Sequence, residues 1–133
     1  MEKKKYVLKS SILESAKVSA DGTENSEHIF DMIERAELCF GNIQDNVDLC
    51  MDIFKLNKDN IQDEDEIDAL QLMCEDCITI ENEATSVIES IEIIKGKIKK
   101  HLKVKEYEVE EFLKAILLLE LKSKDIVDKI LRR

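Results

Sequence analysis

The chain has 133 residues, of which 44% are hydrophobic and 38% charged, with a formal net charge of −10. This length fits a single domain with a sizeable core. Three glycines and no proline are too few for the tight turns of an all-β sandwich or barrel, and the lack of a glycine-rich stretch argues against phosphate-cradling loops and dinucleotide-binding motifs.

The first 22 residues form a segment of their own, which the turn-forming run Asp21-Gly22-Thr23 separates from the rest. Leu8, Ile12 and Ala16 recur at a four-residue spacing, which predicts a short helix over residues 4–19. The early lysines are not followed by an apolar run long enough for a signal peptide. We therefore expect an N-terminal segment over residues 1–22 and a bundle domain over residues 23–133.

The first long helix is predicted over residues 26–55. Apolar residues recur there at alternating spacings of four and three, and every position of the series is apolar: Ile29, Ile33, Ala36, Phe40, Ile43, Val47, Cys50 and Phe54. This is the period of a helix that buries one face. Asn25 or Ser26 can cap its N-terminus, and residues 56–60 interrupt the pattern.

The second helix, predicted over residues 61–103, carries the longest periodic series: Leu70, Met73, Cys77, Ile80, Ala84, Val87, Ile91, Ile94, Ile98 and Leu102. Asp59 and Asp63 each begin a sequence that resembles a capping box. Lysines crowd the other end, where the helix dipole favours cations. Gly96 is the expected weak point of this helix, because glycine has a low helix propensity.

A third helix is predicted over residues 106–132, where one face carries Val109, Phe112, Ile116, Leu119, Ile126 and Ile130. The connections between the long helices are short, so successive helices are expected to be antiparallel neighbours. The predicted fold is all-α: an antiparallel up-down-up bundle of three long helices, with the short N-terminal helix packed on it or used in self-association.

Charge is divided unevenly along the chain: residues 1–20 carry +3, residues 21–94 carry −18 and residues 95–133 carry +5. An acidic body with only six aromatic residues makes nucleic-acid binding unfavourable overall. The longest stretch without Asp, Glu, Lys or Arg spans seven residues, so no membrane span is predicted. Four cysteines are too few for a disulfide scaffold and fit reduced thiols, hence a cytoplasmic location.

Cys74 and Cys77 have the spacing of a thiol metal or redox motif. An antiparallel hairpin that turns near residue 58 would place Cys39 level with Cys77, so these three thiols are candidate ligands for zinc. A redox role needs a thiol at a helix start, whereas this motif falls inside a predicted helix. The competing interpretation treats the cysteines as small hydrophobic core residues.

Acidic residues cluster at the start of the second helix, where we take four as candidates for partner binding: Glu64, Asp65, Glu66 and Asp68. The alternative is a solvated helix face, with weak binding of hard cations as a further option. Neither histidine follows a glutamate by three residues, so the di-metal centre of ferritin-like bundles, which uses that motif, is not expected.

Residues 28–132 resemble one three-helix repeat of the PhoU-like phosphate-uptake regulators. The likeness rests on the order of the long helices, on the run Ile80-Glu81-Asn82-Glu83-Ala84-Thr85, and on a third helix that begins in acids. Bundles of this family carry Glu/Asp-x-x-x-Asp motifs that bind metal clusters. The resemblance implies a metal role for Glu81, although Thr85 stands at the position of the motif's aspartate; Glu106 and Glu110 also have the motif's spacing.

The predicted function is that of a non-enzymatic helical-bundle interaction or regulatory protein, which acts through protein–protein contacts without a cofactor. Two alternatives remain open. One is a metal-binding bundle, through Glu81 or through the thiols of Cys39, Cys74 and Cys77. The other is nucleic-acid binding through the basic residues 95–133.

Self-association as a homodimer is also predicted, because apolar residues lie beyond the primary seams: Val7, Leu8, Met32, Cys39, Ile53, Ile67, Cys74, Ile88, Leu118 and Leu121. Surplus apolar stripes on soluble helices mark partner surfaces, and closed two-fold dimers are the commonest oligomer. The acidic body of one copy could meet the basic segment of another in an antiparallel pairing.

Overall fold

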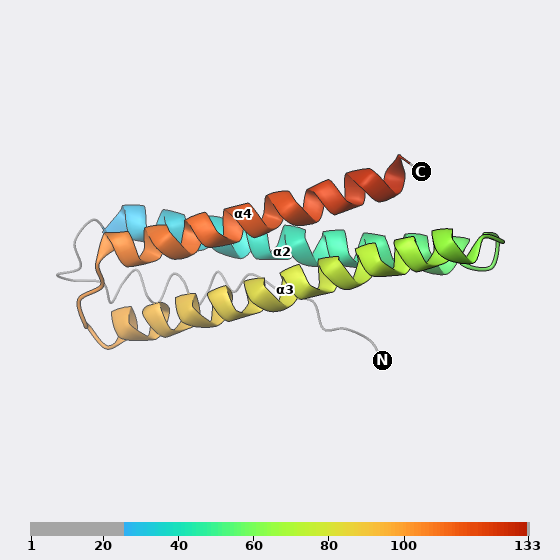
Figure 1. Ribbon diagram of the computed structural model, residues 1–133. Coiled ribbons are helices and arrows are strands. Elements are labelled where there is room, and N and C mark those ends of the chain that lie inside the picture. The colour runs from blue at the N-terminus through green and yellow to red at the C-terminus, as the bar shows by residue number, and fades with distance from the viewer. Residues whose placement is uncertain (1–25, 133) are drawn as a thin grey trace.

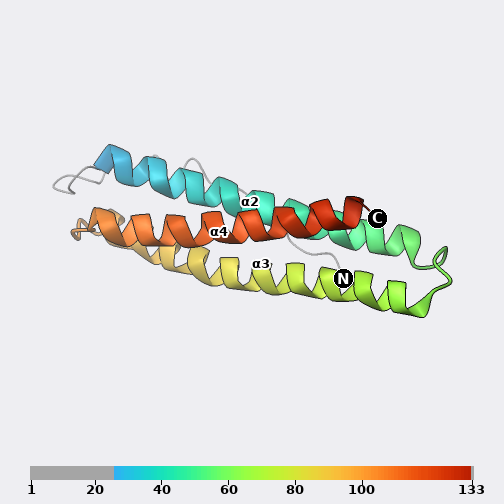
Figure 2. The ribbon, with the colours of Figure 1, turned by 45° about the horizontal axis from the view of Figure 1, so that its top comes forward.

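The computed structural model describes residues 26–132, which form three helices: α2 (Ser26–Asn57), α3 (Glu64–Lys99) and α4 (Glu106–Leu131). Helix accounts for 88% of these residues, and none of them lies in a strand. The helices lie side by side and alternate in direction (Figures 1 and 2). The predicted all-α bundle of three long helices is confirmed, whereas the helix predicted over residues 4–19 and the boundary at residue 22 lie outside the described residues.

The start of α3 is set by a side-chain cap. The carboxylate of Asp63 accepts a 3.0 Å hydrogen bond from the backbone N–H of Asp65, so Asp63 rather than Asp59 is the N-cap. The helix therefore begins at Glu64, three residues after the predicted limit, and α2 continues to Asn57. The acids of the first turn of α3 interact favourably with the helix dipole.

The end of α3 is set by a residue in the left-handed conformation. His101 has a φ of 59°, and the N–H groups of His101 and Leu102 donate to the carbonyls of Ile98 and Lys97 at 3.0 and 2.9 Å. These two bonds form a Schellman motif, which terminates a helix and usually uses glycine at this position. The helix ends at Lys99 instead of 103, and it runs uninterrupted through the expected weak point at Gly96.

The apolar core consists of two clusters along the bundle, and each helix contributes one buried polar residue between them: Gln44, Glu81 and Ser123. The Ser123 hydroxyl accepts a 2.9 Å hydrogen bond from the Asn46 amide and donates to the Glu120 carbonyl at 2.8 Å. The first of these bonds joins α2 to α4 and helps to hold the two helices in register. None of the described helices has the length and apolar character needed to cross a membrane.

Candidate interaction surface

The outward-facing side of α4 carries a continuous line of exposed residues. Its eight members follow one another at spacings of three or four and lie opposite the buried face of the helix: Tyr107, Glu110, Lys114, Leu118, Leu121, Asp125, Lys129 and Arg132. We call this set the α4 stripe. Tyr107, Leu118 and Leu121 are 60%, 54% and 64% exposed. Large apolar side chains gathered on one exposed face are typical of an interaction surface.

Four of the charged members of the α4 stripe are paired along the helix. The amine of Lys114 lies 3.2 Å from the carboxylate of Glu110, and that of Lys129 lies 3.1 Å from Asp125. The amine of Lys105 lies 5.8 Å from the centre of the Tyr107 ring, within cation–π range. Because these groups are well exposed, each pair contributes only about 0.3–0.5 kcal/mol within the chain, and the charges stay accessible to a partner.

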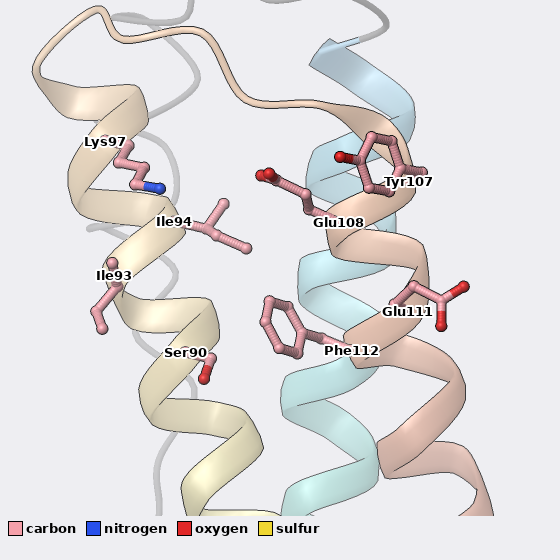
Figure 3. A pocket seen from close by; sticks show the side chains of 8 residues that line it. All are labelled: Ser90, Ile93, Ile94, Lys97, Tyr107, Glu108, Glu111 and Phe112. Atoms are coloured by element: carbon pink, nitrogen blue, oxygen red, sulfur yellow. The ribbon is translucent and has the colours of Figure 1, made fainter.

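An open groove runs between α3 and α4 at the Tyr107 end of the stripe (Figure 3). Ile94 and Phe112 project toward each other across it (Figure 3). The groove has a volume of about 440 Å³ and is lined by Ser90, Ile93, Ile94, Lys97, Tyr107, Glu108, Glu111 and Phe112. It exists because α3 and α4 pack against each other less extensively than either packs against α2. It extends the apolar surface of the α4 stripe onto α3.

Most of the apolar residues predicted to lie beyond the primary seams close the bundle itself. Met32, Cys39, Cys74 and Ile88 are buried, and Ile53 and Ile67 are half-buried. Each helix of a three-helix bundle packs against two neighbours, so its buried face is wider than one seam. Among the described members of that set, only Leu118 and Leu121 are exposed, and both belong to the α4 stripe.

The four acids predicted to bind a partner are exposed in the first two turns of α3, at the end of the bundle opposite the groove: Glu64, Asp65, Glu66 and Asp68. With 36 residues, α3 separates the two ends by about 54 Å. At the end that carries the groove, the last turn of α3 and the connection to α4 hold a cluster of five lysines: Lys97, Lys99, Lys100, Lys103 and Lys105. One end of the bundle thus carries a cluster of acids, and the other carries a cluster of lysines.

The structure separates the predicted thiol ligands. The Cys74 thiol donates to the Cys50 carbonyl at 3.4 Å, and the thiols of Cys50 and Cys77 are hydrogen-bonded. Cys39 lies in the other apolar cluster, against Glu120. The expected alignment of Cys39 with Cys77 is wrong, because the connection between α2 and α3 covers residues 58–63. In the packed bundle, Cys50 instead lies against the Cys-x-x-Cys pair.

The surroundings of these thiols keep them protonated. Burial, assisted by Glu120, raises the pKa of Cys39 to about 12, and burial raises the pKa of Cys74 to about 11. The pKa of Cys50 is raised chiefly by its hydrogen bond with Cys77 and then by burial. Because thiols act as nucleophiles and ligands in their thiolate form, these positions suit core residues.

The metal candidates are not assembled into one site. Within residues 26–132, no group of three or more His, Cys, Asp or Glu side chains is placed to hold a metal ion. Glu81 is buried between the two core clusters. Glu106 is 3.0 Å from the imidazole of His28, and Glu110 pairs with Lys114, so the acids with PhoU-like spacing in α4 make contacts within the bundle.

The seam between α2 and α3 holds a buried ion pair that the sequence patterns did not indicate. The Lys95 amine lies 3.0 Å from the Glu37 carboxylate and 3.2 Å from that of Glu92. The side chains of Lys95 and Glu37 are 3% and 0% exposed. His28 and Glu106 form an ion pair at the seam between α2 and α4. Their side chains are 59% and 32% exposed. The Lys95–Glu37 pair is thus far more buried than the His28–Glu106 pair.

Buried side chains also occupy the side of α2 that faces away from α4. Phe30, Glu37 and Gln44 are buried at seven-residue intervals. Residues nine apart lie two and a half turns apart, on opposite sides of a helix. Cys39 is nine residues from Phe30, and Asn46 is nine residues from Glu37; both face α4. On α3, Glu81, Ile88 and Lys95 are buried at the same interval. We call these six residues the α2/α3 face.

No family model, curated protein or solved structure matches the chain. The resemblance to PhoU-like regulators therefore stays a prediction. The sequence analysis identified only Leu118 and Leu121 among the residues of the α4 stripe. Most of the stripe is charged, so a search for apolar residues at helical spacing does not detect it. The three- and four-residue spacing of the stripe was nevertheless present in the sequence.

Proposed function

We propose that the protein is a non-enzymatic helical-bundle interaction protein that acts through protein–protein contacts and forms a homodimer. The observation that carries this proposal is the exposure of Tyr107, Leu118 and Leu121 on one side of α4, beside the groove between α3 and α4. Burial of such side chains at a contact is favourable, and aromatic residues contribute strongly to interfaces. The outward side of the bundle thus has the composition of a binding surface.

Charge complementarity supports a second copy of the chain as the partner. One end of the bundle carries an acidic cluster of Glu64, Asp65, Glu66 and Asp68, and the other end carries a lysine cluster around the connection from α3 to α4. Two copies placed antiparallel bring each acidic cluster beside a lysine cluster. In this arrangement the four acids predicted from the sequence contribute to partner binding.

The oligomeric state of the full chain tests this proposal. Light scattering near physiological salt is expected to give about twice the chain mass of 15.4 kDa. Leu118→Asp, which places a charge in the exposed apolar surface, is expected to shift the protein toward monomer. Leu38→Asp is the matched control, because Leu38 is exposed to a similar degree on α2. A wild-type chain that stays monomeric throughout the micromolar range would contradict the proposal.

We also propose that residues 4–19 form the short N-terminal helix and cover the α2/α3 face. Burial of that face on the side away from α4 supports this proposal. Residues 1–20 carry +3, which complements the carboxylates of Glu37, Glu81 and Glu92. Leu8 and Ile12 supply the apolar side that such a helix needs.

A further inference from the structure

We infer that the α4 stripe of one copy pairs antiparallel with the α4 stripe of a second copy, about a two-fold axis that passes between Leu119 and Glu120. This inference rests on the proposed homodimer and specifies its contact surface. All residues of the stripe are exposed, and their order along α4 determines which of them meet. An antiparallel two-fold axis pairs each residue with the one that lies equally far from the midpoint on the other copy.

Each of the four pairs made in this way is chemically complementary. Leu118 faces the partner's Leu121 at the centre. Lys114 faces the partner's Asp125, and Glu110 faces the partner's Lys129 one turn further out. Tyr107 faces the partner's Arg132 at the end of the stripe, and a guanidinium stacks well on an aromatic ring. The two-fold axis makes each pair occur twice. In this register, every one of the eight stripe residues in both copies therefore faces a complementary residue.

The ion pairs already present along α4 favour this register. Glu110 and Lys114 are paired within one helix, and so are Asp125 and Lys129. Antiparallel pairing places the first pair of one copy against the second pair of the other, with opposite charges facing each other. Two small pairs thus become one network of four charges. Networks of this kind contribute more than isolated surface ion pairs.

The same charges disfavour the parallel alternative. A two-fold axis parallel to α4 would place each residue against its own copy, so Lys114 would face a lysine and Asp125 an aspartate. Like charges in contact discriminate against a wrong arrangement. In the antiparallel arrangement, by contrast, Glu111 and Asp128 approach each other only at the edge of the contact, where solvent screens them.

The contact is small, which sets the expected strength of the dimer. With 26 residues, α4 is about 39 Å long, and each copy offers three large apolar side chains. A single helix pair of this size falls at the low end of specific interfaces. We therefore expect a reversible dimer with a dissociation constant on the order of micromolar.

A charge exchange in the full chain tests the register. In the Lys114→Asp variant, the new aspartate of each copy faces the partner's Asp125, so like charges meet at two places in every dimer. We expect the dissociation constant to rise at least about tenfold, equivalent to about 1.4 kcal/mol. Adding Asp125→Lys to the same chain reverses both charges and is expected to restore most of the affinity. Lys124→Asp makes the same charge change outside the stripe and is the matched control. Sedimentation over a concentration series measures all four proteins, and circular dichroism checks that each remains helical.

The possible results separate this inference from the proposed function. Weakening by Lys114→Asp, rescue by the exchange and no effect of Lys124→Asp would support the register. A wild-type dimer that Lys114→Asp leaves unchanged, or that the exchange fails to rescue, would overturn the α4 pairing while the homodimer stands. A monomeric wild-type chain would overturn both.

Discussion

At the scale of single residues, the ion pair of Glu37 and Lys95 is the least expected feature of the core. Removing two charges from water is costly, and their attraction offsets that cost only when the geometry is good. Here the Lys95 amine is 3.0 Å from Glu37 and 3.2 Å from Glu92. Such a pair adds little net stability but strongly disfavours any register of α2 and α3 that separates the two charges.

Replacement of Lys95 by methionine is expected to lower the free energy of unfolding by about 3 kcal/mol, because it removes the nearest cation from a carboxylate that stays buried. Urea denaturation measures the change. Lys114→Met, which breaks a well-exposed ion pair with Glu110, should cost less than about 1 kcal/mol. Equal effects of the two substitutions would show that the Glu37–Lys95 pair is not buried in solution.

The buried thiols predict a loss of stability at alkaline pH. In the unfolded chain a cysteine titrates near its ordinary pKa of 9.0, whereas in the folded chain the pKa of Cys39 is raised to about 12 and that of Cys74 to about 11. Above pH 9 the unfolded state therefore binds fewer protons than the folded state. The free energy of unfolding should fall by up to about 1.4 kcal/mol per pH unit for each such thiol.

This loss is absent below pH 9.0, where both states are protonated, and it ends as the folded thiols titrate at about pH 11 to 12. Urea denaturation at pH values below and within this window measures it for the wild-type chain and for Cys39→Ala. The variant should show the shallower pH dependence, since it lacks one of the thiols. Parallel curves would mean that Cys39 titrates normally in the folded protein.

At the scale of elements, the α2/α3 face is the surface that the proposed N-terminal helix would cover. Cys39, on the side of α2 that faces α4, and Glu37, on the opposite side, are both buried. The described residues supply two other helices, α3 and α4, to pack against α2. A helix over residues 4–19 would be about 24 Å long, which is enough to extend along Phe30, Glu37 and Gln44.

The accessibility of the Lys95 amine tests whether residues 4–19 cover it. In the full chain, Leu8→Asp combined with Ile12→Asp should raise the rate of Lys95 acylation at least about tenfold, because loss of a cover worth about 1.4 kcal/mol multiplies the open population by that factor. Mass spectrometry of the acylated peptides measures the rate. Exposed Lys97 serves as the internal control and should react equally in both proteins.

Reactivity of Cys50 and Cys77 distinguishes uncovering from unfolding, since both thiols lie in the core cluster at the other end of the bundle. They should remain unreactive toward thiol reagents in the double variant. If Lys95 stays unreactive while the helix content is unchanged, another part of the molecule covers the α2/α3 face.

At the scale of the whole molecule, charge is separated along the bundle. The net charge of −10 would by itself keep copies apart. The acidic and lysine clusters lie about 54 Å apart, several Debye lengths at physiological salt. Because salt screens the more distant cluster, a neighbouring copy interacts with each charge cluster independently. An antiparallel approach brings opposite charges together at both ends.

The homodimer is accordingly expected to weaken several-fold as salt rises from about 0.1 M to about 1 M, where the Debye length falls from about 10 Å to about 3 Å. Sedimentation at both salt concentrations measures the dissociation constant. The variant with Lys114 and Asp125 exchanged keeps the same net charge and should show the same salt dependence. A dimer that strengthens with salt would indicate an apolar contact without the charge pairing described above.

Most of the fold could be predicted from the sequence, because helical periodicity is a local property. The apolar series of α2, α3 and α4 identified the three helices, and residues such as Ile33, Ile91 and Ile116, which are fully buried, were all members of those series. Helix ends were less well predicted. His101 adopts the left-handed conformation that usually requires glycine, and two sequences at the start of α3 competed as caps.

By itself, the sequence thus determined the three long helices, their antiparallel order and the uneven charge. The tertiary structure decided which residues meet. Cys50 instead of Cys39 meets Cys77, because the packing of α2 against α3, and not the position of the turn alone, sets how far the two helices are displaced along each other. The tertiary structure likewise placed Lys95 against Glu37 and turned the α4 stripe outward. The apolar periodicity of a helix predicts which of its faces is buried. Which residues of two neighbouring helices contact each other depends on the register between the helices, and that register is set by the packing of the bundle.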